Sequence, residues 1–173
     1  ADVRRLAPHP AALLFAVGNE IPPGVVRCHG AARIERFLRE LYHDAKAAAP
    51  AALLTYANFP PTEYLDLSCF DVCAFNVYLH RERDLRAYLG RLQHLAGTKP
   101  LLLAEAGADS IREGLDGQAR LSAAQLQAAN IHGSPDGPWF FIIARNDPER
   151  KSLDLIGITD TSMLRPQVFA LHD

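Results

Sequence analysis

The sequence lacks the features that mark several large classes of protein. Its longest apolar runs, such as LLFAV and WFFIIA, are far shorter than the roughly 20 residues that span a bilayer. It has no arginine-rich run, and its formal net charge of −2 gives no electrostatic reason to bind nucleic acid or a membrane surface. The initial segment ADVRRLAPHP has no apolar core and does not resemble a signal peptide. We therefore expect no nucleic-acid partner and no membrane segment in this chain.

The motifs of several common enzyme classes are also missing. There is no glycine-rich phosphate loop, no serine nucleophile elbow and no HExxH metal motif. The three cysteines, Cys28, Cys69 and Cys73, are an odd number, which argues against a disulfide framework and is compatible with a reducing compartment such as the cytoplasm. Cys69 and Cys73 lack a second Cys or His pair at metal-ligand spacing, so small buried side chains explain them better than zinc does. We expect no metal and no cofactor.

What the sequence does contain is an alternation of short apolar runs with amphipathic segments. The runs have the continuous apolar character of strands buried in a sheet, and the other segments have apolar residues at helical spacing. The predicted strands are 13–17, 53–59, 70–79, 100–107 and 139–144, and the predicted helices are 31–49, 84–95 and 121–130. This alternation predicts an α/β domain over residues 1–173, with a parallel sheet covered by helices.

Four successive predicted strands end on polar or ionisable side chains. These are Asn19 with Glu20, Asn58, Asn76 with Tyr78, and Glu105. In parallel α/β folds, ligands bind at the carboxyl ends of the strands, and buried polar groups there need hydrogen-bonding partners. Each residue taken alone could be a solvated loop residue, but the set predicts a common site.

Glu20 and Glu105 are the pair with the largest chemical consequence. Two carboxylates that face each other across a partly desolvated site do not ionise equally, because the charge on one favours a proton on the other. This difference separates a nucleophile from a proton donor, and cleavage of a glycosidic bond requires that separation. The pair therefore indicates chemistry on glycosides.

Three motifs carry a resemblance to a known family: Gly18-Asn19-Glu20, Tyr78 in FNVY and Glu105 in PLLLAEAG. They resemble the clan of retaining glycoside hydrolases with (β/α)₈ TIM barrels, most closely the catalytic barrel of glycoside hydrolase family 2. In that clan a Glu after Asn ends the fourth strand as acid/base. A Glu that ends the seventh strand is the nucleophile, and a Tyr after the sixth strand hydrogen-bonds it. The resemblance covers about residues 3–118, and NFPPTEYLDL is similar to versions joined to bacterial glycosyltransferases.

The resemblance implies an incomplete TIM barrel with about strands four to eight, and a retaining hydrolase or transglycosidase acting on β-linked glycosides. Glu105 would attack the anomeric carbon, and Glu20 would protonate the leaving oxygen and then act as base. The other residues implied or suggested at the carbohydrate site are Asn19, Asn58, Asn76 and Tyr78. For the amides of residues 58 and 76, an ordinary strand-end hydrogen bond is the alternative to substrate contact.

Two features depart from the family pattern. A barrel with only these strands leaves open parallel edges, which implies a fragment of a longer protein or closure by partner chains. Besides a carbohydrate substrate, the partners that the resemblance suggests are a missing N-terminal half or a fused glycosyltransferase domain. In addition, the family's eighth strand ends on a Trp that supports the sugar ring, whereas Trp139 begins WFFIIA and is expected to pack in the barrel floor.

Two alternatives to a glycosidase therefore stay open. The first is a non-catalytic carbohydrate-binding or scaffold remnant of such a barrel, and the second is a (β/α)₈ enzyme that binds a metal through the two carboxylates. His29 could line the mouth of the site or be a plain loop residue.

Overall fold

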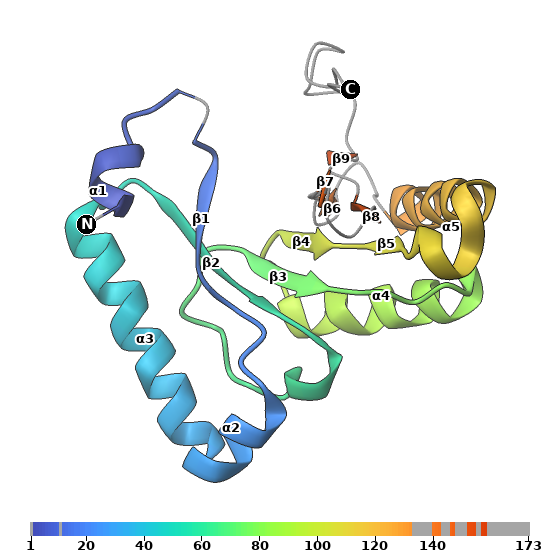
Figure 1. The fold of residues 1–173 in the computed structure, drawn as a ribbon. Coiled ribbons are helices and arrows are strands. Elements are labelled where there is room, and N and C mark those ends of the chain that lie inside the picture. Colours follow the sequence, from blue (N-terminus) through green and yellow to red (C-terminus); the bar gives the residue numbers. More distant parts are fainter. Residues whose placement is uncertain are drawn as a thin grey trace. The chain divides into compact units, whose positions relative to one another are not determined.

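The computed structural model describes residues 2–10, 12–132, 140–142, 146–147, 152–154 and 157–158. The chain divides into two compact units, Ala1–Asn76 and Val77–Asp173, called here the first and second unit. Each contains helices and parallel strands (Figure 1), which confirms the mixed α/β class. The single domain over residues 1–173 and the TIM barrel stay predictions. No helix in the described residues is long and apolar enough to cross a bilayer.

The first unit is built on three parallel strands. Its elements are α1 (Asp2–Leu6), β1 (Leu14–Asn19), α2 (Pro23–His29), α3 (Ala31–Ala48), β2 (Leu53–Asn58), the 3₁₀ turn η1 (Pro60–Thr62) and β3 (Cys73–Asn76). β2 pairs with β1 in the register Leu14–Leu53 and with β3 in the register Ala57–Ala74. α3 packs against β1 and β2 (Figure 1). β2 is the central strand of this unit, with β1 hydrogen-bonded to one edge and β3 to the other.

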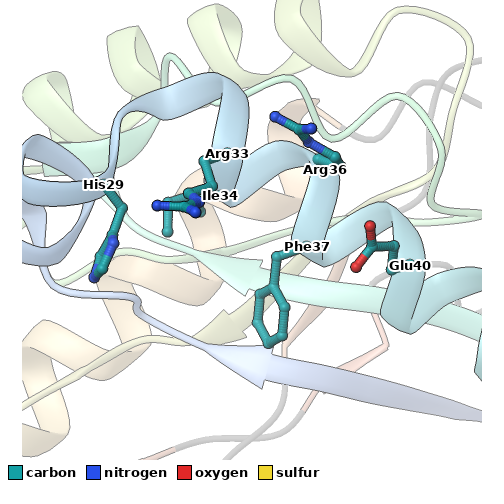
Figure 2. A pocket seen from close by; sticks show the side chains of 6 residues that line it. All are labelled: His29, Arg33, Ile34, Arg36, Phe37 and Glu40. Atoms are coloured by element: carbon teal, nitrogen blue, oxygen red, sulfur yellow. The ribbon is translucent and has the colours of Figure 1, made fainter.

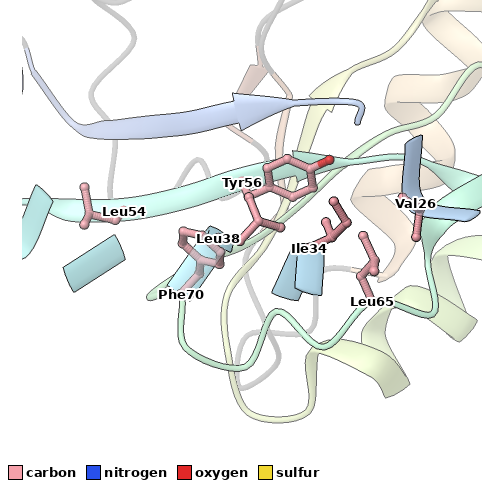
Figure 3. Close-up of a cluster of buried hydrophobic side chains, with 7 residues drawn as sticks. All are labelled: Val26, Ile34, Leu38, Leu54, Tyr56, Leu65 and Phe70. Atoms are coloured by element: carbon pink, nitrogen blue, oxygen red, sulfur yellow. The ribbon is translucent and has the colours of Figure 1, made fainter. Parts of the chain in front are cut away.

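The core of the first unit joins the face of a helix to the face of a strand. Ile34 and Leu38 are four residues apart on α3, while Leu54 and Tyr56 are two residues apart on β2, so each pair shares one face of its element. Figure 3 shows these side chains with the rest of the buried cluster, which consists of Val26, Leu65 and Phe70. Burial of each large apolar side chain stabilises the fold by about 1.5–3 kcal/mol.

Asp71 fixes the chain at the point where it enters β3. Its Oδ2 accepts hydrogen bonds from the N–H of Leu54 at 2.8 Å and from Lys46 Nζ at 2.9 Å, and its own N–H donates to the Leu54 carbonyl at 3.0 Å. Burial raises the pKa of Asp71, but the Lys46 hydrogen bond, the Leu54 N–H and the Lys46 charge outweigh burial and lower the pKa below its ordinary value. The ionised carboxylate therefore stabilises the folded first unit.

Replacing Asp71 with Asn is expected to lower the free energy of unfolding by about 2 kcal/mol at pH 7, because hydrogen bonds to a charged group are lost. Since folding lowers the pKa of Asp71, its stabilisation is present above the unfolded-state pKa of about 3.9 and is lost as the pH falls through the folded value. Urea unfolding followed by circular dichroism should show the gap to wild type closing in acid. Asp44→Asn, at an exposed carboxylate on α3, is the control. An equal effect from both changes would contradict this role.

The second unit contains a parallel strand pair and a small antiparallel sheet. Its elements are α4 (Glu82–Ala96), β4 (Leu101–Glu105), β5 (Gly107–Ala108), α5 (Ser110–His132), β6 (Phe140–Ile142), β7 (Asn146–Asp147), β8 (Ser152–Asp154) and β9 (Gly157–Ile158). β4 pairs in parallel with β6, β9 pairs antiparallel to β6, and β8 lies antiparallel between β5 and β7. Buried Gln118 and Gln125 hold α5 to β5, donating to the carbonyls of Ala108 at 2.9 Å and Gly107 at 3.2 Å.

Several expected elements differ in extent from those observed. The strand expected over 70–79 is shortened to Cys73–Asn76, and at its start Asp71 is held by Lys46 and Leu54. β1 was expected to be buried on both faces, but it is only partly buried and pairs with β2 alone among the described strands. The helix expected over 121–130 extends back to Ser110, across a break at Gly114 (φ 70°).

Two further predictions concern residues near the two ends of the chain. α2 is a helix that the sequence pattern did not predict, and it contains His29 at its exposed last position. Trp139 and residues 143–144 of the strand expected over 139–144 lie outside the described residues.

Candidate functional site

The polar strand-end residues form two hydrogen-bonded clusters. Asn19, Glu20 and Asn76 make one cluster in the first unit. Tyr78 and Glu105 make the other in the second unit. Asn58 belongs to neither.

Asn76 is the centre of the first cluster. The side chain is 1% exposed, and its Nδ2 donates to Glu20 Oε1 at 2.8 Å and to Asn19 Oδ1 at 3.1 Å. The amide therefore ties the end of β3 to the end of β1, two strands that each pair with β2. Its Oδ1 is buried and has no hydrogen-bond partner among the described residues. A buried acceptor of this kind favours a ligand or water that donates a hydrogen bond.

Glu20 has an unusual backbone. Its φ of 45° is the one positive φ outside glycine in the described residues. The turn follows a register shift between Ala16 and Asn19, and the Glu20 N–H donates to the Ala57 carbonyl at 3.0 Å. A left-handed residue with a side chain costs about 1–2 kcal/mol, and such strain concentrates at functional positions.

Tyr56 supports this turn, although it is not among the residues predicted from the sequence. Its hydroxyl oxygen accepts the N–H of Ile21 at 2.7 Å, and its ring would lie 3.2 Å from a Cβ on Gly18. Burial raises the pKa of the Tyr56 hydroxyl; the Ile21 hydrogen bond lowers it and the Glu20 charge raises it, and the net pKa is above its ordinary value. The signal in the sequence is a Tyr inside a buried strand, because its hydroxyl needs a partner.

Asn58 organises its own loop. Its Nδ2 donates to the Thr62 carbonyl at 3.0 Å, and its Oδ1 accepts the Thr62 hydroxyl at 2.6 Å and the Phe59 N–H at 2.9 Å. The side chain is fully buried. This is the strand-end hydrogen bonding that was the alternative to substrate contact, and binding of substrate by Asn58 stays a prediction.

The second cluster places a tyrosine hydroxyl on a carboxylate. Tyr78 donates to Glu105 Oε2 at 2.5 Å, the length of a charge-assisted O–H···O⁻ bond. The Glu105 carbonyl also accepts the N–H of Val77 at 2.8 Å, so the end of β4 is tied to the segment that carries the tyrosine. The hydrogen bond expected between these two side chains is therefore present. It orients the carboxylate, while Tyr78 remains 46% exposed.

Other candidate residues lie outside these clusters. Cys69 and Cys73 are half-buried and Cys28 is exposed, and none of the three forms a disulfide. Among the described residues, no group of three or more His, Cys, Asp or Glu side chains could hold a metal. His29 lines a hollow of about 420 Å³ beside α3 (Figure 2), together with Arg33, Ile34, Arg36, Phe37 and Glu40.

Comparisons with protein-family models, curated proteins and solved structures found no match. Function is therefore inferred from the two clusters themselves.

The positive φ of Glu20 predicts that glycine is more stable than alanine at this position, the reverse of the order inside a helix. Glu20→Gly should be more stable than Glu20→Ala by about 1 kcal/mol, because glycine adopts a positive φ without a steric penalty. Glu40, inside α3, provides the control: there glycine should be less stable than alanine by about 1 kcal/mol. Thermal or urea unfolding of the four variants measures both differences. If alanine is the more stable residue at both positions, the left-handed turn does not persist in solution.

Proposed function

We propose that the protein is a retaining glycoside hydrolase or transglycosidase that acts on β-linked glycosides, with an incomplete TIM barrel of about strands four to eight. The observation that carries the proposal is the 2.5 Å hydrogen bond from Tyr78 to Glu105. It matches the pairing of tyrosine and nucleophile that the resemblance implied. The half-buried Glu105 carboxylate also lies at the end of a parallel strand, and folds of this kind bind ligands at that end.

Glu105 is the proposed nucleophile. With Oε2 held by the Tyr78 hydroxyl, Oε1 is the oxygen that attacks the anomeric carbon and forms the glycosyl-enzyme. The hydrogen bond fixes the carboxylate before substrate binds, so less orientation has to be achieved in the transition state.

Glu20 is the proposed acid/base. The Asn76 amide holds Oε1 at 2.8 Å, which sets the direction of the carboxyl group, and exposed Asn19 is the residue proposed to bind a sugar hydroxyl. Glu20 gives a proton to the leaving oxygen, then takes one from water or from an acceptor sugar. Retention requires the two carboxyl groups to be about 5–5.5 Å apart in the working enzyme.

The test is turnover of 4-nitrophenyl β-glycosides by the chain. Glu105→Gln should lower kcat by about 10³-fold or more, because the nucleophile is lost. Tyr78→Phe should cause a smaller loss of about 10-fold, because the carboxylate remains but is no longer oriented. Glu82→Gln is the matched control, since that carboxylate lies in the same unit and accepts only from Arg86 among the hydrogen bonds described for it.

A covalent probe separates the mechanism from the alternatives. An activated 2-deoxy-2-fluoro glycoside forms the glycosyl-enzyme faster than water removes it, so mass spectrometry should find one fluorosugar on the peptide that carries Glu105. Turnover that Glu105→Gln leaves unchanged would rule out this mechanism. If the chain shows neither turnover nor labelling, the non-catalytic carbohydrate-binding alternative is favoured.

A further inference from the structure

Tyr56 connects the core of the first unit to the turn that carries Glu20. The side chain is 1% exposed, and its ring stacks on Phe70 with the centroids 6.5 Å apart (Figure 3). At the other end, its hydroxyl accepts the N–H of Ile21, the residue directly after Glu20, at 2.7 Å. A ring held in the core cannot move away from this bond, so the position of the Ile21 amide is fixed.

Three hydrogen bonds converge on Glu20. Its own N–H binds the Ala57 carbonyl at 3.0 Å, its carboxylate accepts from Asn76 at 2.8 Å, and the next N–H along the chain binds Tyr56. Together they hold a φ of 45°, which is unfavourable for a glutamate left to itself. Without the Tyr56 bond, the peptide after Glu20 can rotate toward an ordinary backbone conformation. The carboxylate would then leave the direction set by Asn76.

Gly18 makes room for this arrangement. A Cβ at this position would come within 3.2 and 3.3 Å of two atoms of the Tyr56 ring, closer than ordinary van der Waals contact. The backbone of β1 therefore passes directly over the ring whose hydroxyl holds the following turn. The Gly-Asn-Glu sequence and the buried tyrosine on β2 act as one unit.

We propose that Tyr56 is a positioning residue for the proton-donating carboxyl group of Glu20, an inference that rests on the proposed function. Tyr56 does not touch the substrate in this account; it acts through the backbone of the Glu20 turn. Its effect is confined to steps in which Glu20 moves a proton. A poor leaving group such as an alkoxide needs that proton, whereas 2,4-dinitrophenolate departs without it.

Tyr56→Phe is the direct test, because it removes the hydroxyl and keeps the ring. The ratio kcat/KM reports the glycosylation step, so it should fall about 10–100-fold for a methyl or alkyl β-glycoside and less than about 3-fold for the 2,4-dinitrophenyl β-glycoside of the same sugar. Gly18→Ala disturbs the same contact from the side of β1 and should show the same selective loss. It keeps the test available if the first variant folds poorly.

Tyr42→Phe is the matched control. Its ring packs edge-on against Phe70, and its hydroxyl donates to Asp71 at 3.3 Å rather than bonding to the Glu20 turn. The variant therefore removes a hydroxyl from the same core and keeps the ring. This variant should treat both substrates as wild type does. An equal loss on both substrates in Tyr56→Phe would mean a merely structural role and overturn the proposal. A wild-type chain that cleaves neither substrate would instead refute the proposed function, and the positioning role with it.

Discussion

Burial of β2 is the constraint on which the first unit depends. From Leu54 to Asn58 every residue of this strand is buried, so each backbone N–H and C=O group needs a protein partner. β1 and β3 supply these partners, one on each edge. The side chains alternate accordingly: Leu54 and Tyr56 enter the core, whereas Thr55 donates to the Val72 carbonyl at 2.7 Å. The same alternation brings the Tyr56 hydroxyl to the Glu20 turn. The packing of the core and the geometry of the first cluster are therefore consequences of one buried strand.

Much of the fold could be predicted from local pattern, because apolar periodicity is a local property. The helix expected over 31–49 is α3, and the strand expected over 53–59 is β2, stopped as anticipated before Pro60. α2 was missed because Pro23 and Gly24 are typical of a turn, yet a proline is also tolerated in the first turn of a helix. The strand expected over 70–79 begins later than predicted for a different reason. Asp71 forms an ion pair with Lys46, a residue 25 positions away, and no local sequence pattern predicts this contact.

The candidate site likewise has features that could be expected from the sequence and features that depend on how the strands pair. Strand ends drew attention to these polar side chains, and the contact between Tyr78 and Glu105 was expected from the resemblance. What the sequence could not distinguish was Asn58 from Asn76, since both are amides at the end of an apolar run. Asn58 is hydrogen-bonded to Thr62, which lies in the short loop that contains two prolines. Asn76 instead donates to Asn19, at the end of β1. The role of Tyr56 was equally hidden, because a buried hydroxyl can be assigned a partner only after the strands are paired.

The left-handed backbone at Glu20 places two requirements on one side chain. Aspartate tolerates such a φ better than glutamate, because its short side chain can hydrogen-bond locally. It would, however, withdraw the carboxyl group by one methylene, about 1.5 Å, and so out of reach of the Asn76 amide. The backbone conformation thus favours aspartate at this position, whereas the distance to Asn76 favours glutamate. The longer acid is compatible with the turn only because neighbouring strands hold it there, which makes the reach of this carboxylate a property of the sheet rather than of the residue.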